Sequence, residues 1–483
     1  MINWKTLLNV LGLLLVLEGA AMLLSIPFSI YYEEPIIWHL LLSAGITAGV
    51  GYFSYFLTRS KGMQINKRDG YIIVSLSWVV FSFFGALPFI LTGSIPSFTD
   101  AFFETMSGFT TTGASILNDI ESLPRGILFW RSMTHWLGGM GIIVLSLAIL
   151  PILGIGGMQL FVAEVPGPTP DKLHPRIKET AKRLWAIYIL LTALETLLLS
   201  LGGMNFFDAI CHAFATMATG GYSTKQASIA HFSSPFIHYV IIIFMFLAGT
   251  NFTLSYFALH LKFDKIWKNE EFRFYFLFIA AFTIVIAVGL SFAGETSSFE
   301  TSFRDSLFQV VSIITTTGFV TADYLNWMPI LTALIFVLMF FGGSAGSTGG
   351  GIKIMRVVLL LKNSILELKR LLHPKAIVPV RLNNQPVSQE IITNVLAFVS
   401  FYMLILVVSM TVMSTLGYDI ESSIGAVVAT LGNIGPGIGA VGPVENYYHI
   451  PMFGKWFLSA LMLIGRLELF TVLVLFSRYF WEN

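Results

Sequence analysis

Four short segments of this chain share one pattern, in which an acidic residue opens a half-apolar stretch and a glycine closes it. The acid and the glycine of each segment are Asp100 and Gly113, Asp208 and Gly221, Asp305 and Gly318, and Glu421 and Gly435. The spacing is thirteen residues in the first three segments and fourteen in the last. Glycine accepts dihedral angles that let consecutive carbonyl groups point the same way. Four such turns could form a ring of carbonyl oxygens around a dehydrated cation, which favours ion permeation over chemistry on a substrate.

The turns themselves supply the candidate ion-binding residues. These are Thr111, Thr112 and Gly113; Thr219, Gly220 and Gly221; Thr316, Thr317 and Gly318; and Asn433, Ile434 and Gly435. Backbone carbonyls replace the water of an alkali cation without adding full charge, and threonine hydroxyls offer further oxygens. The helix-compatible sequence before each turn is about ten residues long, too short to cross a bilayer. We expect each short helix to aim the negative end of its dipole at the ion, and the leading acid to cap its other end.

The composition indicates a membrane protein. The chain has 483 residues, of which 55% are hydrophobic and 11% are charged, whereas a soluble globular chain carries about 25% charged residues. Lipid is therefore the expected solvent. A net charge of +1 gives no reason to expect a nucleic-acid partner. The single cysteine, Cys211, excludes an internal disulfide framework and a cysteine-rich metal site.

Apolar stretches recur along the chain, and a membrane crossing needs roughly 20 apolar residues. We place spans near residues 7–30, 37–58, 70–93, 128–153, 184–203, 236–261, 274–294, 328–342, 391–416 and 456–480. The stretch 328–342 is short for a crossing. The acid-to-glycine segments lie between alternate spans, so the repeating unit is a span, a re-entrant half-helix, a turn and a second span.

The expected fold class is an all-α polytopic membrane protein with four pore repeats around a pseudo-fourfold axis, preceded by two extra spans. The copies lie about a hundred residues apart, which fits a whole membrane hairpin as the repeating unit. The predicted boundaries are 1–68 for the two extra N-terminal spans, and 69–165, 166–270, 271–383 and 384–483 for pore repeats 1 to 4. The third repeat contains a glycine-rich break.

Basic residues cluster between the repeats, on the side opposite the acid-to-glycine segments. The clusters fall within 59–68, 172–183, 262–273 and 362–381. Cytoplasmic loops of membrane proteins carry the excess of lysine and arginine. We therefore expect these loops and both termini to be cytoplasmic, and the re-entrant segments to enter the membrane from outside.

The glycine-rich break separates the short span 328–342 from the apolar stretch 352–361. It runs from Gly342 to Gly351 and has little helix propensity. We expect a span broken near the middle of the membrane, with a loop that faces the pathway or is packed in protein. A disordered linker is the alternative interpretation, because glycine and serine also make linkers. A phosphate-binding loop is disfavoured, because its spacing is off by one residue and no strand precedes it.

Several charged residues lie in or beside apolar stretches, where charge is costly and is usually functional or paired. Arg466 lies in the middle of the last span, and Lys353 directly follows the glycine-rich break. We expect Arg466 to point into the protein near the pathway, with a buried ion pair to another repeat as the alternative. Glu104, Arg131 and Glu195 raise the same question.

At its four turns the chain resembles the Trk/Ktr/HKT superfamily of potassium transporters, most closely the TrkH branch. The segments that carry this resemblance are Phe109–Ser115, Ala218–Ser223, Thr315–Phe319 and Asn433–Gly437. The resemblance covers the whole chain, including the two N-terminal spans. It implies a homodimer with one pathway per subunit, a location in the prokaryotic cytoplasmic (inner) membrane and a cytosolic nucleotide-binding ring as regulatory partner. In related plant transporters a serine at the first filter position accompanies sodium preference, so Gly113 favours potassium.

The resemblance also implies a role for the glycine-rich break, as an intramembrane gate below the filter. The gate residues it implies are Gly346, Ser347, Thr348, Gly349, Gly350 and Gly351, together with Lys353 and Arg466. Small side chains would let such a loop move. Lys353 could repel cations from the closed loop or tether it.

The function we expect is uptake of K⁺ across the membrane, with K⁺ at the filter as the transported ion and with no organic cofactor. A sodium-permeable or weakly selective monovalent cation channel of the same architecture is the alternative. A carrier for an organic solute would call for inverted repeats and charged midplane groups, which this pattern lacks. The sequence shows no His-Glu-x-x-His motif, and we expect no enzyme.

Overall fold

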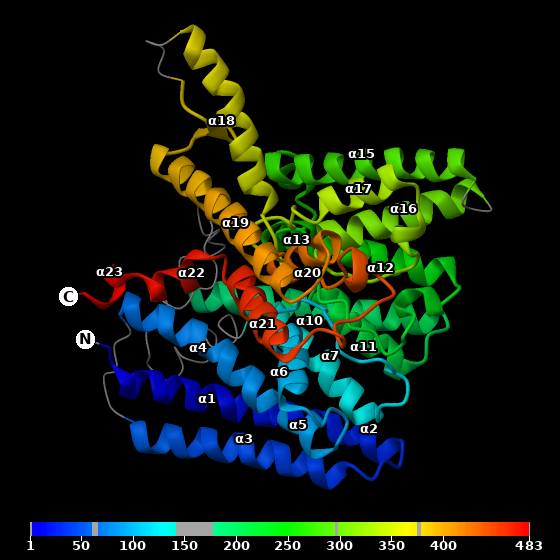
Figure 1. Ribbon diagram of the computed structural model, residues 1–483, viewed down its shortest axis with the longest axis vertical. Helices are drawn as coiled ribbons and strands as arrows, with labels where there is room; N and C mark the ends of the chain where they lie inside the picture. Colours follow the sequence, from blue (N-terminus) through cyan, green and yellow to red (C-terminus); the bar gives the residue numbers. More distant parts are fainter. Residues whose placement is uncertain (1, 60–65, 142–176, 295–297, 374–377, 483) are drawn as a thin grey trace.

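The computed structural model describes residues 2–59, 66–141, 177–294, 298–373 and 378–482. Within these ranges the regular secondary structure is almost entirely helical (Figure 1). The exception is a small hairpin of two antiparallel strands, β1 (Arg381–Leu382) and β2 (Gln385–Pro386). The second half of the expected span 128–153 and the basic residues Lys172 and Arg176 lie outside the described residues.

The long apolar helices match the expected spans in most places. They are α1 (Trp4–Met22), continued by η1 (Leu23–Ser25) and α2 (Ile26–Tyr31); α3 (Ile37–Thr58); α4 (Lys67–Gly85), continued by α5 (Leu87–Leu91); α10 (Ile177–Leu201); α15 (Glu270–Ala293); and α19 (Gln389–Thr415). Six such helical runs are long and apolar enough to cross a membrane within the described part of the chain. Only 28% of the apolar window of α15 is buried inside the protein. Its other apolar side chains face outward, as lipid contact requires.

The first two spans form a closely packed pair, with α1 lying along α3 (Figure 1). Small residues allow this approach. A side-chain carbon placed on Gly12 would lie 2.6 Å from the carbonyl oxygen of Gly51 and 2.7 Å from the backbone nitrogen of Tyr55. Direct backbone contact at glycine is the usual way that helices associate in lipid.

Four short helices, each followed by a second helix, form the centre of the molecule. The short helices are α6 (Phe98–Phe109), α11 (Phe206–Met217), α16 (Phe299–Ile314) and α20 (Ile420–Leu431). The helices that follow them are α7 (Arg125–Gly139), α12 (Pro235–Ala248), α17 (Pro329–Leu338) and α21 (Met452–Arg466). Each short helix packs on its own partner, and α7 also packs on α11, α12 on α16 and α21 on α6. The fourth pair of helices therefore packs against the first pair.

Two of the expected spans, near 236–261 and 456–480, are each broken into two helices at a sharp bend. α12 is followed by α13 (Phe252–Leu259) at an angle of 111°. α21 is followed by α22 (Phe470–Leu473) and η5 (Val474–Phe476) at 112°. At the second bend Glu468 and Leu469 have positive φ angles of 53° and 58°. Apolar composition does not reveal either bend, because both halves of each span remain apolar.

The first bend is stabilised by contacts that only the folded chain provides. The side chain of Asn251 caps α13 by accepting a hydrogen bond from the backbone nitrogen of Thr253 at 2.8 Å. The carbonyl oxygens of Ala248 and Gly249, which a continuing helix would use, accept hydrogen bonds from the backbone nitrogens of Thr348 and Ser344. The glycine-rich segment therefore takes the place of the missing helical turn.

The expected helix break in the third repeat is confirmed. α17 ends at Leu338, and α18 (Ile354–Leu372) begins sixteen residues later. The intervening segment is held together at its base, where the backbone nitrogen of Gly342 donates to the carbonyl oxygen of Ile352 at 2.8 Å. α18 continues well beyond the expected stretch 352–361, and it projects with the start of α19 from the body of the molecule (Figure 1).

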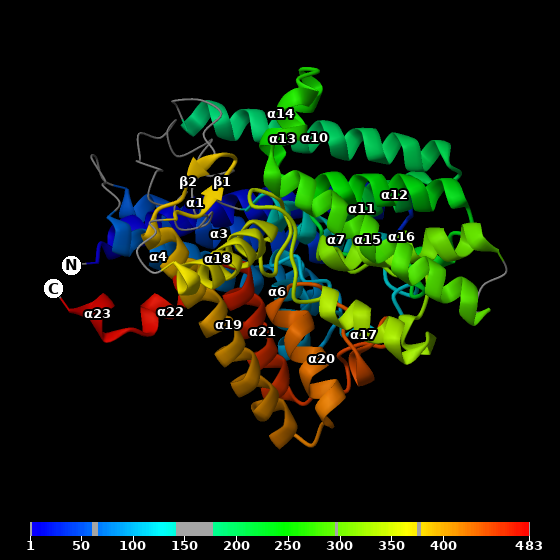
Figure 2. The ribbon, with the colours of Figure 1, turned by 90° about the horizontal axis from the view of Figure 1, so that it is seen from above.

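The remaining elements are short connections and the C-terminal segment. They are η2 (Ser228–His231), α14 (Phe263–Trp267), η3 (Tyr324–Asn326), η4 (Gly439–Val441) and α23 (Arg478–Trp481). The two ends of the chain lie near each other at one side of the molecule in both views (Figures 1 and 2).

Candidate ion-binding site

The four turns have the same unusual backbone conformation. Each contains a residue with positive φ two positions before its glycine: Thr111 (52°), Thr219 (55°), Thr316 (59°) and Asn433 (53°). The glycines themselves have φ of 80° at Gly113, 79° at Gly221, 79° at Gly318 and 98° at Gly435. Non-glycine residues rarely adopt positive φ, so four occurrences at equivalent positions are not chance. We refer to the four turns below as the filter turns.

The filter turns meet around one point, each glycine against a carbonyl oxygen of the next turn. A side-chain carbon placed on any of these glycines would come closer than 3.0 Å to that oxygen. The pairs are Gly113 with Gly220, Gly221 with Thr317, Gly318 with Ile434, and Gly435 with Thr112. The last pair returns to the first turn, so the four contacts form a closed ring. The structure thus brings together all twelve residues expected for ion binding.

A cavity of about 90 Å³ opens next to this ring. All four filter glycines line it, together with Arg131, Lys225 and other residues that follow the glycines in the chain. The ring is therefore not sealed on this side, and a small hydrated ion could approach it from there.

Each short helix ends immediately before its filter turn, but the acids expected as caps do not cap it. The helix-capping residues are Ser97, Asn205, Ser298 and Asp419, whose side chains accept from a backbone nitrogen in the first turn. Asp100 and Asp208 lie inside the first turn, Asp305 lies in the second turn, and Glu421 is exposed. The expectation of an acid cap is therefore wrong for these residues, because the nearby serine, asparagine or aspartate occupies the cap position.

The true cap positions show that the fourth segment is regular. Ser97, Asn205 and Asp419 each precede their filter glycine by sixteen residues. The third segment is the longer one, because α16 begins a turn earlier after Ser298. Hydrogen bonds from the hydroxyl and backbone nitrogen of Ser422 hold the pKa of Asp419 below its usual value, which keeps this cap ionised.

The glycine-rich segment, residues 342–351, lies against the other side of the filter turns, and we call it the glycine loop. The backbone nitrogen of Gly350 donates to the hydroxyl of Thr316 at 2.7 Å. The hydroxyl of Thr348 donates to the carbonyl oxygen of Met217, at the end of α11, at 3.1 Å. A side-chain carbon on Gly350 would lie 2.6 Å from the carbonyl oxygen of Gly432. The loop thus contacts the second, third and fourth repeats at once, and a disordered linker is excluded.

Two cationic side chains hold the glycine loop through its carbonyl groups. Arg466 donates to the carbonyl oxygens of Thr348 and Gly138, each at 2.7 Å. The buried ammonium group of Lys353 donates to the carbonyl oxygen of Gly349. Arg466 therefore lies inside the protein, as its charge predicted, and beside the loop, as the resemblance implied. Glu468, two residues later, instead pairs with Arg356.

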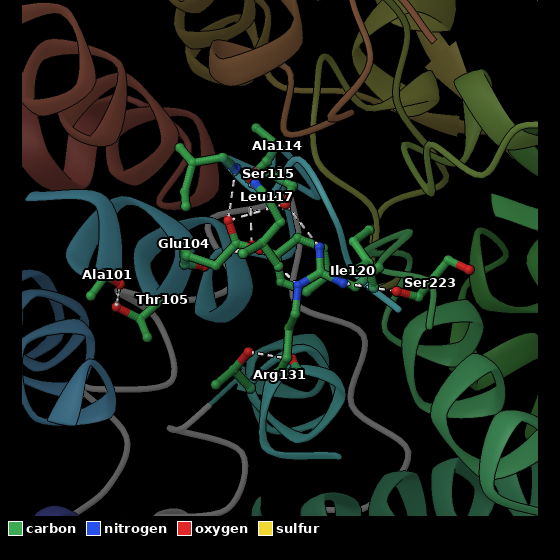
Figure 3. A network of polar contacts seen from close by, with 12 residues as sticks. Ala101, Glu104, Thr105, Ala114, Ser115, Leu117, Ile120, Arg131 and Ser223 are labelled. Carbon is green, nitrogen blue, oxygen red and sulfur yellow. Dashed lines mark hydrogen bonds and ion pairs between the residues drawn. The ribbon is translucent and has the colours of Figure 1, made fainter. Parts of the chain in front are cut away.

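A buried ion pair lies behind the first filter turn (Figure 3). Arg131 of α7 donates from Nε to Glu104 of α6 at 2.7 Å, and both side chains are almost completely buried. Glu104 also accepts from the backbone nitrogen of Ile116 at 2.9 Å. The sequence singled out both charges but not their pairing, because the two residues belong to different helices.

Comparison with known proteins agrees with the family expected from the turns. The family model TrkH, described as a cation transport protein, matches residues 43–482. The Trk system potassium uptake protein TrkH of Escherichia coli (strain K12) is 43% identical over 484 residues, with all of both chains covered. The protein of the same name from Vibrio parahaemolyticus is 40% identical over 489 residues, again over the whole of both.

The fold agrees with a solved structure as well. The crystal structure of the potassium transporter TrkH from Vibrio parahaemolyticus matches with a TM-score of 0.90 and 38% sequence identity. The match covers 100% of both chains.

Proposed function

This chain belongs to the TrkH family of cation transport proteins, which are multi-span helical membrane proteins and not enzymes, and we propose that it takes up K⁺ across the cytoplasmic membrane. The ion crosses through the ring of backbone carbonyls that the four filter turns form. K⁺ is the transported substrate, and the chain needs no organic cofactor for this task.

The observation that carries the proposal is the closed ring of contacts between filter glycines and neighbouring carbonyl oxygens. The carbonyl oxygens of Thr112, Gly220, Thr317 and Ile434 each lie against the glycine of an adjacent turn. Uncharged oxygens in such a ring replace the hydration shell of an alkali cation. A side chain at any of the four glycines would fill the space that the oxygens and the ion need.

Two further features favour a cation at this point. α6, α11, α16 and α20 all end at the filter turns, so the negative ends of four helix dipoles converge there. The hydroxyl oxygen of Thr111 and the amide oxygen of Asn433 are buried without a hydrogen-bond partner among the described residues. Unsatisfied buried oxygens are costly in a protein, and a bound cation would satisfy them.

The glycine loop is the proposed gate. It lies against the filter turns on the side opposite the cavity, held by Arg466 and Lys353. In this position it blocks the route of an ion that leaves the filter. Opening requires the loop to give up its hydrogen bonds to Thr316 and Met217.

The larger organisation that we propose follows the expected one. The two extra helices at 1–68 precede four pore repeats with boundaries at 69–165, 166–270, 271–383 and 384–483, arranged around a pseudo-fourfold axis. Both termini and the basic loops between repeats face the cytoplasm, where a nucleotide-binding ring would dock. Two copies of the chain form a dimer with two separate pathways.

Uptake of K⁺, Rb⁺ and Na⁺ into proteoliposomes that contain the purified protein tests this proposal. We expect K⁺ and Rb⁺ to enter and Na⁺ to be excluded. Equal entry of Na⁺ would instead favour the weakly selective channel. Growth of a bacterial host that lacks potassium uptake, with and without the gene for this chain, provides an independent check.

A further inference from the structure

The filter turns are alike in backbone conformation, but the side chains that hold them in place differ from repeat to repeat. Nine residues before the filter glycine lie Glu104 in the first repeat, His212 in the second and Gln309 in the third. In the fourth repeat the position nine residues before Gly435 is held by Ala426, which follows Gly425. Glu104, His212 and Gln309 each face the segment that follows their own filter turn, which we call the post-filter segment.

Three of these positions use neutral groups or none. His212 forms a hydrogen bond of 2.9 Å between Nε2 and the hydroxyl of Ser223. With its amide group in the orientation that satisfies its surroundings, the oxygen of Gln309 accepts from the backbone nitrogens of Thr321 and Ala322 at 2.9 and 3.2 Å. In the fourth repeat Ala426 carries no polar group, and the backbone of Ile438 packs directly on the neighbouring Gly425. Glu104 is the charged member of the set.

Glu104 accepts hydrogen bonds from two neighbouring residues of the first post-filter segment. Its carboxylate accepts a hydrogen bond from the hydroxyl of Ser115 at 2.9 Å and one from the backbone nitrogen of Ile116 at 2.9 Å. Ser115 is only two residues after Gly113. The carboxylate therefore fixes the chain immediately beyond the filter glycine.

Arg131 joins this first segment to the second. Its three nitrogens have three different partners: Nε donates to Glu104 at 2.7 Å, Nη1 to the carbonyl oxygen of Ser223 at 2.9 Å, and Nη2 to the hydroxyl of Ser115 at 3.1 Å (Figure 3). Ser223 is two residues after Gly221, as Ser115 is two residues after Gly113. One guanidinium group thus spans the two equivalent positions behind adjacent filter turns.

The aromatic ring of Tyr222, in the second repeat, packs against Arg131 and restricts its position. The guanidinium carbon of Arg131 lies 3.6 Å from the ring centroid of Tyr222, and the ring of His135 is stacked at 3.9 Å. Two groups this close cannot share one face of the ring, so Tyr222 is wedged between two side chains of α7. Its hydroxyl donates to the carbonyl oxygen of Glu104 at 2.7 Å.

We propose that Glu104 and Arg131 are positioning residues for ion selectivity, because their buried ion pair fixes the spacing between the first and second filter turns. The proposal rests on the proposed function of the filter. A carbonyl ring that cannot contract leaves an ion smaller than K⁺ with poor coordination. Without the pair, two of the four turns are free to approach each other, and Na⁺ becomes a better substrate.

The test measures the ratio of K⁺ to Na⁺ uptake in proteoliposomes, alongside the amount and thermal stability of folded protein. Glu104→Gln keeps the shape of the side chain but removes its charge. Arg131→Lys keeps a positive charge, but one ammonium group cannot reach three partners at once. We expect both variants to lower the K⁺/Na⁺ ratio by about tenfold or more while K⁺ still enters.

Asp100→Asn is the matched control, because it removes another ion pair of the same helix. Asp100 lies one turn before Glu104 on α6 and pairs with Lys455 of α21 at 2.6 Å. We expect this variant to keep the wild-type ratio. If Glu104→Gln does not fold, Ser115→Ala removes only the shared hydroxyl, and we expect a smaller fall of about two- to threefold.

The outcomes separate this inference from the proposed function. Wild-type protein that admits no K⁺, or does not prefer it, contradicts the proposed function itself. Selective wild-type protein whose folded Arg131→Lys and Ser115→Ala variants keep the wild-type ratio overturns the inference alone. An equal loss of selectivity in Asp100→Asn would also overturn it, because any buried ion pair of α6 would then have the same effect.

Discussion

The guanidinium group of Arg466 donates a hydrogen bond of 2.7 Å to the carbonyl oxygen of Thr348, which joins the end of α21 to the middle of the glycine loop. A second bond of 2.7 Å leads from the same side chain to Gly138, at the end of α7. Through this one residue the fourth repeat holds the loop of the third against the first. Hydrogen bonds from a charged group contribute about 1.5–3 kcal/mol each to stability. Their loss should therefore favour the open loop.

We predict that Arg466→Gln increases ion flux. Loss of a charge-assisted bond worth about 1.5–3 kcal/mol shifts the balance between closed and open loop by about ten- to a hundredfold. The measurement is the initial rate of Rb⁺ uptake into proteoliposomes, and we expect it to rise about tenfold. Arg478→Gln is the control, because Arg478 is exposed and pairs only with nearby Glu482 among the described residues. A rate at or below that of wild type in Arg466→Gln would contradict the gate.

Shortening the glycine loop should have the same effect. Deletion of residues 346–350 removes the loop carbonyls that bind Arg466 and Lys353, so we expect a higher rate of Rb⁺ uptake. An unchanged rate would exclude a gating role for the loop.

A pair of point substitutions within the loop refines this prediction. Thr348→Val keeps the side-chain shape but loses the bonds to the carbonyl oxygens of Met217 and Ala248. Ser347→Ala loses only a bond to Ser344 inside the loop. We expect about a threefold to tenfold increase in uptake for Thr348→Val and none for Ser347→Ala. Equal effects would mean that contact with the repeats does not hold the loop.

Gly113→Ser should damage the filter specifically. The side-chain carbon of a serine at position 113 would collide with the carbonyl oxygen of Gly220, which lies in the ring. We expect the preference for K⁺ over Na⁺ to fall by at least about tenfold, as measured by competitive uptake. Gly93→Ser is the control, because Gly93 also has positive φ, 72°, but faces open space. Both variants carry the backbone strain of about 1–2 kcal/mol, so a shared defect would point to strain and not to the ring.

Ser97→Ala should destabilise α6, because Ser97, and not Asp100, caps this helix. Loss of a helix cap costs about 1 kcal/mol. Thermal unfolding in detergent should show a lower midpoint for Ser97→Ala than for Ser94→Ala, whose hydroxyl only contacts Thr92. Equal midpoints would argue against Ser97 as the cap.

The sequence was sufficient to find the features that repeat. The four turns carry a glycine at a nearly constant distance from an acid, and the structure brings those glycines together. The break at residues 342–351 was visible because glycine is a poor helix former. That Arg466 points into the protein follows from the cost of leaving a charge in lipid, and its place beside the break was implied by the family resemblance.

Features that depend on partners far away in the chain were not visible. The bend after α12 is stabilised by Ser344 and Thr348, about a hundred residues later. The partner of Glu104 was similarly hidden, because Arg131 belongs to another helix and also reaches Ser223 in the next repeat. Local pattern also misplaced the helix caps, since serine or asparagine beside an acid competes for the same position.

The most direct test of the central claim is to locate the ion. A structure determined from crystals grown with Rb⁺, with anomalous data collected at the rubidium absorption edge, would show where the ion binds. We expect a peak on the axis of the ring, surrounded by the carbonyl oxygens of Thr112, Gly220, Thr317 and Ile434. Rb⁺ bound elsewhere, with none in the ring of a transport-active protein, would contradict the account.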